Sequence, residues 1–191
     1  ERFAFDGTSV WTSPVHVSTK TISAFHFPEP VTDGHDGFYM PFNTSNPNNA
    51  ALTDVYVQRL RGNGTLWSST GTELLTGTTT QRFGGAMGLV DDNLGLMVPV
   101  QVTNTGQSQG GWNVQRLDTA GTVQLGPAGT EIVPPSAQLA APVDAASTSD
   151  GLIVVYTEGG FGQVHLWAAR VGVLGDPVWA APVELCAVNS N

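Results

Sequence analysis

The stretch VYVQRLRGNGTLW, residues 55–67, reads as a strand, a tight turn at its second glycine and a second strand. The same phrase returns as WNVQRLDTAGTVQ at residues 112–124 and, more faintly, as LWAARVGVLGDPVW at residues 166–179. The glycine of each turn supplies the positive φ that a tight hairpin requires. We therefore predict a chain built from one repeated hairpin unit, and a repeat of this kind decides the architecture.

Four arginines set the period of the repeat. They are Arg2, Arg59, Arg116 and Arg170, and a glycine follows each of them five residues later. A tryptophan comes soon after three of these glycines, as Trp11, Trp67 and Trp179, while Gln124 takes that place in the third copy. A Gly-led apolar run precedes the arginine in three copies, as GFYMPF from Gly37, GLMVPV from Gly95 and GLIVVY from Gly151.

Each unit contains four short predicted strands and no segment with helical periodicity. The continuous apolar strands indicate burial on both faces, which sheets stacked around an axis provide. The predicted fold is therefore all-β, a β-propeller with one unit per blade; a β-solenoid is the structural alternative, although its repeats are usually shorter.

The boundaries of the units suggest an incomplete ring. Complete blades span about residues 22–75, 82–133 and 137–186, and residues 1–17 match only the outer half of another. We expect a single domain over residues 1–191 that forms a portion of a larger propeller, since closed rings have four to eight blades. The missing strands would come either from the remainder of a longer chain or from another protein chain, because an open stack exposes apolar faces and strand edges.

The succession of Asp-Gly, an apolar strand, VYVQRL, a glycine turn, TLW and GTEL resembles the blades of secreted bacterial β-propeller repeat proteins. The resemblance covers essentially the whole chain and implies the propeller fold, which hosts binding modules, scaffolds and enzymes alike. The turn Asp6-Gly7-Thr8 departs from the Ser-x-Asp-x-Gly-x-Thr-Trp pattern of sialidase-like propellers. Sialidase activity is therefore not implied.

The composition excludes several partners. Charged residues make up 12% of the chain, the formal net charge is -9, and Lys20 is the single lysine. Nucleic acids and anionic membrane surfaces require clustered Lys and Arg, so neither is expected as a partner. No apolar run reaches the length of a membrane span. Few lysines with abundant Thr, Asn and Gly indicate a secreted or cell-surface protein.

Two further features concern processing and redox chemistry. The chain begins Glu1-Arg2-Phe3 without an initiator methionine, which suggests a processed chain. Cys186 is its only cysteine. It is interpreted either as a small buried apolar side chain or as a residue bonded to a partner outside these residues.

The repeated arginines need partners, because an isolated buried charge is prohibitively costly. A carboxylate on the next predicted strand gives three expected pairs: Arg59 with Glu73, Arg116 with Glu131, and Arg170 with Glu184. Such bidentate pairs would fix the register of the outer strands. In the first copy His16 takes the place of the glutamate, so Arg2 needs another acceptor. Binding of an anionic ligand is the functional alternative.

The remaining candidate sites are weaker. The acidic turns carry Asp33 and Asp36, then Asp91 and Asp92; clustered oxygen ligands suit Ca²⁺, while Asp-Gly is also ordinary turn chemistry. No cofactor other than Ca²⁺ is considered. Trp112 and Trp167 break the repeat pattern and are candidates for stacking on carbohydrate. No HExxH, GxSxG, GxGxxG or phosphate-loop motif occurs, so no catalytic residue is assigned.

These observations favour a non-enzymatic extracellular binding or scaffold module. Two alternatives stay open: a lectin-like or glycan-processing propeller, and a structural subunit of a larger extracellular assembly. The variable loops at residues 43–54 and 103–111 are expected to carry contacts.

Overall fold

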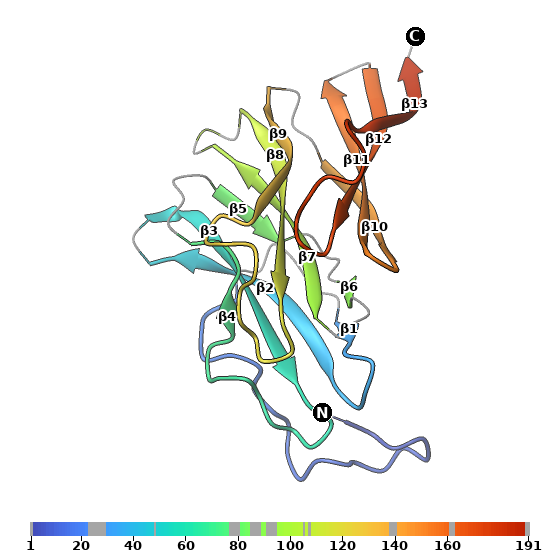
Figure 1. The fold of residues 1–191 in the computed structure, drawn as a ribbon. Coiled ribbons are helices and arrows are strands. Elements are labelled where there is room, and N and C mark those ends of the chain that lie inside the picture. Colours follow the sequence, from blue (N-terminus) through green and yellow to red (C-terminus); the bar gives the residue numbers. More distant parts are fainter. Residues whose placement is uncertain are drawn as a thin grey trace.

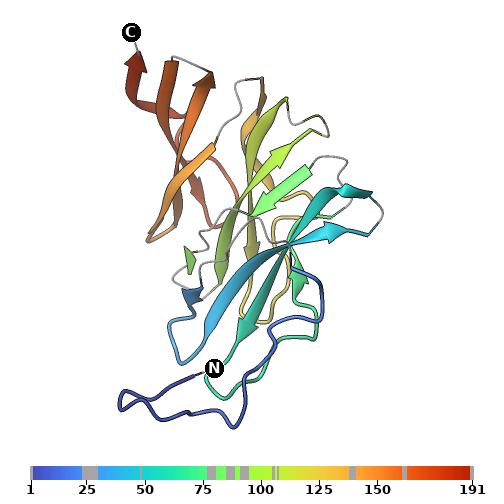
Figure 2. The same cartoon turned by 180° about the vertical axis from the view of Figure 1, so that it is seen from behind.

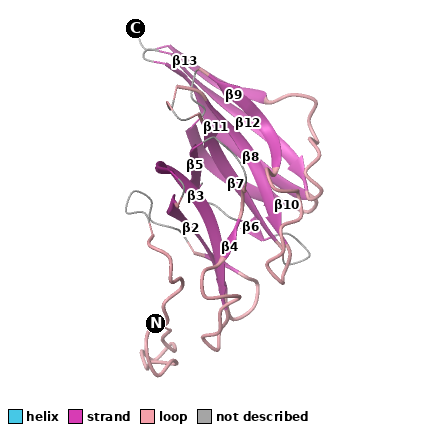
Figure 3. Ribbon diagram, turned by 90° about the vertical axis from the view of Figure 1, so that its left-hand side faces the viewer, coloured by secondary structure: helices cyan, strands magenta, loops and turns pink. Residues whose placement is uncertain are grey.

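The computed structural model describes residues 2–22, 30–47, 49–76, 81–84, 89–90, 95–104, 106, 108–137, 141–160 and 163–189. These residues form strands, turns and loops and contain no helix (Figure 3). The prediction of an all-β chain is confirmed for this part of the sequence. Within it, no helix is long and apolar enough to cross a membrane.

The strands form three antiparallel sheets (Figures 1 and 2). Sheet 1 has the order β1 (Val31–Thr32), β2 (Phe38–Asn46), β3 (Asn49–Leu60) and β4 (Thr72–Glu73). Sheet 2 has the order β5 (Gln81–Gly84), β7 (Leu96–Thr103), β8 (Gly110–Leu117) and β9 (Thr130–Ser136), and β6 (Leu89–Val90) also pairs with β7. Sheet 3 has the order β10 (Ala141–Thr148), β11 (Gly151–Gly160), β12 (Gln163–Gly172) and β13 (Val183–Asn189).

Sheet 2 lies between the other two sheets, and β7 is buried along both faces. One face of β7 places Leu96, Val98 and Val100 in a core shared with sheet 1. The residue between them, Met97, packs in a second core with Leu152 of sheet 3. This alternation follows from the period of two along a strand. The predicted burial of an apolar strand on both faces is therefore confirmed for β7.

The glycine turn recurs with one geometry at Gly7, Gly64, Gly121 and Gly175, whose φ values are 85°, 86°, 86° and 85°. In each turn the glycine N–H donates to the carbonyl three residues earlier, at 2.8 to 3.0 Å. The N-terminal segment, residues 2–22, thus carries the same turn as the three sheets. It runs alongside sheet 1, where the Thr19 N–H donates to the Ser69 carbonyl at 2.9 Å.

Candidate functional site

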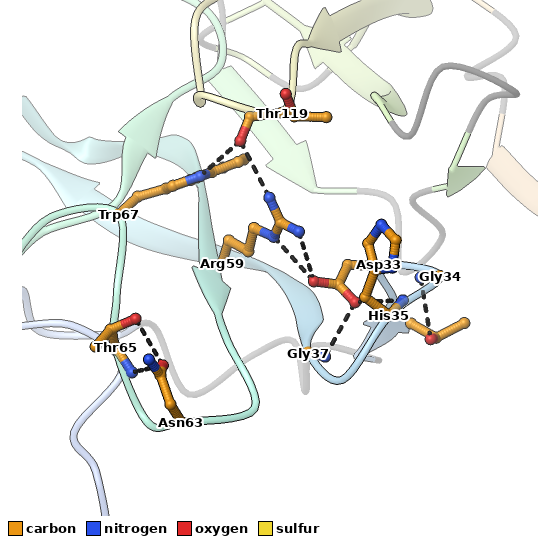
Figure 4. A network of polar contacts seen from close by, with 10 residues as sticks. Asp33, Gly34, His35, Gly37, Arg59, Asn63, Thr65, Trp67 and Thr119 are labelled. Carbon is orange, nitrogen blue, oxygen red and sulfur yellow. Dashed lines mark hydrogen bonds and ion pairs between the residues drawn. The ribbon is translucent and has the colours of Figure 1, made fainter.

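A buried ion pair joins Asp33 to Arg59 (Figure 4). Asp33 lies in the turn between β1 and β2 and is 1% exposed. Its Oδ2 accepts hydrogen bonds from Nε and Nη2 of Arg59 at 2.9 and 2.8 Å, and its Oδ1 accepts the N–H groups of His35 and Gly37 at 2.9 and 3.0 Å. Burial raises the pKa of Asp33, but the Arg59 hydrogen bonds, the two N–H groups and the Arg59 charge together hold it below the ordinary value. Asp33 therefore stays ionised and anchors the arginine.

The predicted pairing of Arg59 with Glu73 is wrong. Glu73 lies opposite Tyr56 in the β3–β4 ladder, and its Oε2 accepts a hydrogen bond from the Tyr56 hydroxyl at 3.0 Å. Tyr56 and Arg59 are three positions apart on one strand, so their side chains point to opposite faces of the sheet. The arginine therefore projects away from the glutamate and towards the Asp33 turn.

The predicted pairing of Arg170 with Glu184 is wrong for the same reason. Glu184 lies opposite Trp167 and its Oε1 is 2.6 Å from Nδ1 of His165, whereas Arg170 donates to Asp150 at 2.6 Å. The same offset recurs in sheet 2, where the register places Glu131 opposite Asn113, three positions before Arg116. The ladder therefore gives no support to the pairing of Arg116 with Glu131.

The repeated arginine and tryptophan instead connect neighbouring units. Nη1 of Arg59 and Nε1 of Trp67 both donate to the carbonyl of Thr119, in the turn of sheet 2, at 3.1 Å each (Figure 4). One unit earlier, Nη1 of Arg2 and Nε1 of Trp11 donate to the carbonyl of Gly62, in the turn of sheet 1, at 2.8 and 2.9 Å. Each acceptor lies two residues before the turn glycine. We call this arrangement the turn clamp: Arg and Trp of one unit donating to one turn carbonyl of the next unit.

The turn clamp makes a specific prediction at Gly121. A Cβ atom there would lie 2.9 Å from Cδ2 of Trp67, on a backbone with φ +86°, whereas at Gly126 (φ +76°) it would meet nothing within 4 Å. We expect Gly121→Ala to lower the free energy of unfolding by about 3 kcal/mol, from strain plus overpacking, and Gly126→Ala by about 1 kcal/mol, from strain alone. Chemical denaturation of both variants measures the difference. Equal losses would mean that the indole does not constrain the turn.

Two buried glutamines form a second connection, which the sequence analysis missed. Nε2 of Gln58 donates to the carbonyls of Val17, in the N-terminal segment, and Ser68 at 3.0 and 2.7 Å. Nε2 of Gln115 donates in the same way to the carbonyls of Leu74, directly after β4 of sheet 1, and Gly126 at 3.0 and 2.7 Å. The signal was present in the sequence, because VQRL occurs with its glutamine in these two copies only.

The junction between sheets 2 and 3 lacks both the glutamine and the tryptophan. Ala169 precedes Arg170, whereas glutamine precedes Arg59 and Arg116. Leu125 takes the position in sheet 2 that Trp67 has in sheet 1. The Leu125 backbone N–H donates to Oε1 of Gln115 at 3.0 Å, as the Trp67 backbone N–H donates to Oε1 of Gln58 at 3.1 Å. The expectation that Gln124 replaces the tryptophan is therefore wrong. The Gln124 side chain is exposed and donates to Asp118.

A hollow of about 380 Å³ lies at this junction. We call it the junction groove; its lining residues are Val133, Pro134, Pro135, Ser136, Tyr156, Glu158, Trp167, Ala181 and Pro182. A smaller hollow of about 180 Å³ shares Ala181 and Pro182 with the junction groove and is also lined by Ala169.

The strands beside the groove have irregular register. The register shifts at Trp112 in the β8–β9 ladder and between Leu166 and Trp167 in the β12–β13 ladder. Such irregularities re-aim side chains, and here they occur in strands on both sides of the groove.

The groove combines aromatic, proline and hydrogen-bonding groups. Tyr156 lies opposite Trp167 across the β11–β12 ladder and is 2% exposed. Burial, and then the charge of Glu158, raise the pKa of Tyr156 to about 12, so the phenol stays neutral. The Ser136 hydroxyl donates to Oε1 of Glu158 at 2.8 Å, and His165 stacks against Trp167 with ring centroids 6.3 Å apart.

The two tryptophans predicted to stack on a ligand have different outcomes. Trp112 is 0% exposed and packs with Val133 and Tyr156, so the prediction of an exposed platform is wrong for it. Trp167 is half-buried and lines the junction groove, where it stays a candidate. Among the described atoms, both indole N–H groups are buried without a hydrogen-bond partner.

The remaining candidates are the acidic turns and the cysteine. In the described part of the chain, no three His, Cys, Asp or Glu residues are grouped to hold a metal ion. Both carboxylate oxygens of Asp33 already accept hydrogen bonds from Arg59 and from backbone N–H groups. Asp36 is exposed, and its Oδ1 is 3.5 Å from Nη2 of Arg2. Asp91 and Asp92 lie outside the described residues. Cys186 is exposed with a free thiol, so its interpretation as a buried side chain is wrong.

Comparisons with protein-family models, with curated proteins and with solved structures give no match. The junction groove and the turn clamp are the features of the chain that bear on its function.

Proposed function

We propose that this chain is a non-enzymatic extracellular binding module built from β-propeller-type blades, with the junction groove as its ligand site. Each sheet would be one blade, over about residues 22–75, 82–133 and 137–186, with an outer half blade at residues 1–17. Support comes from the packing of sheet 1 on sheet 2 and of sheet 2 on sheet 3, in the order of the sequence, and from the turn clamp, which repeats at two successive junctions. A secreted or cell-surface location fits the composition.

The observation that carries the binding role is the contrast between junctions. At two of them a buried glutamine bridges the neighbouring units, whereas at the third the glutamine is replaced by Ala169 and a groove lies beside it. Concave, largely apolar sites with a few polar groups are where proteins usually take small ligands.

A lectin-like role is the second candidate, favoured by the grouping of Trp167 with Ser136 and Glu158. An indole offers a flat apolar surface to the C–H face of a sugar ring. The hydroxyl and carboxylate beside it offer hydrogen-bond partners to the hydroxyl groups of the sugar.

The test is calorimetric titration of the chain with a panel of neutral oligosaccharides and proline-rich peptides. We expect one member of the panel to bind and Trp167→Ala to weaken its binding by at least about tenfold, which corresponds to roughly 1.4 kcal/mol. Phe5→Ala is the matched control, because it removes an exposed aromatic ring far from the groove. Binding that Trp167→Ala leaves unchanged would place the ligand elsewhere, and binding of peptides alone would exclude the lectin-like candidate.

A further inference from the structure

The exposed apolar side chains gather at the two ends of the sheet stack. Among the described residues, the large exposed hydrophobic side chains are Phe3, Phe5 and Val10 at one end and Val164, Leu174, Val178, Val183 and Leu185 at the other. The first group belongs to the N-terminal segment and the second to sheet 3 and its turn. The chain ends lie at opposite ends of the molecule in all three ribbon views (Figures 1, 2 and 3). The two surfaces therefore do not cover each other within one chain.

At the sheet 3 end, the donors of a turn clamp are present without an acceptor. Arg59 binds its aspartate through two nitrogens and the next turn through the third. Arg170 binds Asp150 through Nη2 alone, and its Nε is buried with no partner among the described residues. No described residue accepts a hydrogen bond from its Nη1, the nitrogen that binds the next turn in Arg59. Trp179, the tryptophan of this unit, is half-buried beside Arg170, and no described residue accepts its indole N–H.

At the N-terminal end, the acceptor of a turn clamp is present without donors. Phe5 lies two residues before Gly7, as Gly62 and Thr119 lie two residues before their turn glycines, and its side chain is fully exposed. A tryptophan ring packs against Gly64 and against Gly121, but nothing lies within 4 Å of the Cβ position at Gly7. The turn therefore has the backbone geometry of a clamped turn and an open place where the indole would lie.

We propose that a second copy of this chain binds here, with the sheet 3 end of one copy against the N-terminal turn of the next. Arg170 and Trp179 of one copy donate to the Phe5 carbonyl of its neighbour, and the exposed apolar side chains of the two ends are buried together. The interface continues the junctions already present within the chain. Because the two surfaces differ, it is head-to-tail and forms rings or open chains of subunits. This association is independent of any ligand in the junction groove.

Sedimentation velocity of the intact chain tests the proposal, from about 1 μM to about 200 μM protein in buffered physiological salt. A reducing agent excludes disulfide dimers through the exposed Cys186. We expect the average mass to rise with concentration from 20.0 kDa to at least a dimer. A chain that stays monomeric over this range overturns the proposal, whatever the groove binds.

Two charge substitutions test the orientation of the contact. Phe5→Asp and Leu174→Asp each place a carboxylate at one exposed end, where neither side chain supports the fold. We expect each variant alone to be monomeric and their equimolar mixture to form a dimer and nothing larger, since each retains one intact end. Ala128→Asp, on an exposed turn away from both ends, should associate like the parent chain. A mixture that stays monomeric, or single variants that still associate, would rule out the head-to-tail contact.

Discussion

Replacement of Gln115 by methionine is expected to lower the free energy of unfolding by about 4 kcal/mol. Gln115 is 0% exposed; its Nε2 donates to two carbonyls, and its Oε1 accepts the N–H groups of Arg116 and Leu125 at 2.9 and 3.0 Å. Methionine fills a similar volume but makes none of these hydrogen bonds. Each of the two carbonyls and two N–H groups costs about 1–3 kcal/mol if it stays buried without a partner. The expected total is smaller than the sum, because water or a small shift of the backbone gives some of these groups a new partner.

Urea denaturation of Gln115→Met beside Gln124→Met measures this loss. The control makes the same chemical change at an exposed side chain of the neighbouring loop, and should change stability by no more than about 0.5 kcal/mol. The backbone amide hydrogen of Leu125 should also exchange faster with solvent in Gln115→Met, because it loses its hydrogen bond to Oε1 of Gln115. A loss of less than about 1 kcal/mol at Gln115 would show that the sheets do not depend on this bridge.

Asp33→Asn is expected to lower the free energy of unfolding by about 3 kcal/mol. Asparagine keeps one acceptor oxygen, so its NH2 group must face either the donors of Arg59 or the N–H groups that Asp33 now accepts. In both orientations the charge of Arg59, whose side chain is 11% exposed, loses its counter-ion. Removal of one partner of a buried pair costs more than the pair contributes, because the other charge stays desolvated. Combining Asp33→Asn with Arg59→Met should therefore recover part of the loss.

The exposed pair in sheet 3 provides the matched control. Asp150 and Arg170 also form an ion pair, through a single hydrogen bond, but their side chains are 57% and 27% exposed. Water stabilises either charge once its partner is removed, so Asp150→Asn should cost clearly less than Asp33→Asn. Equal losses would mean that burial does not set the strength of these pairs.

The pH dependence of stability gives Asp33 an independent test. The pKa of Asp33 is lowered in the folded chain relative to its ordinary value of 3.8. The ionised Asp33 therefore stabilises the folded chain, and this contribution is fully present above the unfolded pKa of 3.8. It is lost as the pH falls from 3.8 through the lower pKa of the folded chain. The difference in stability between the parent and Asp33→Asn should therefore be constant near neutral pH and shrink below about pH 4. A difference that keeps its neutral-pH size down to about pH 2 would not come from the charge of Asp33.

Several features of the fold could be predicted from the sequence because they depend on local chemistry. The turns at Gly64 and Gly121 follow from a glycine at a fixed distance after an arginine, since only glycine adopts positive φ without strain. The all-β class and the burial of both faces of β7 follow from continuous apolar runs bounded by turn residues. Each of these predictions needs only residues close together in the chain.

The partners of the polar residues could not be predicted in the same way. The predicted pairing of Arg59 with Glu73 rested on the spacing of the two residues in the sequence. Side chains alternate between the two faces of a strand, and this alternation places Arg59 and Glu73 on opposite faces of the sheet. The acceptor in the next turn, the carbonyl of Thr119, is a backbone group 60 positions away and has no signature in the sequence. The bridging role of Gln58 likewise depends on backbone groups of a neighbouring unit.

The sequence by itself therefore determined the glycine turns and the all-β class, because glycine conformation and apolar periodicity act over a few residues. Only the tertiary structure decided that arginine, tryptophan and glutamine connect one unit to the next, and that Trp167 faces a groove while Trp112 is buried. Hydrogen bonds between units depend on how whole sheets are stacked, and many pairings of polar groups are compatible with one pattern of residues. The packing of the sheets selects among them, because every buried polar group must find a partner at the position where the stack places it.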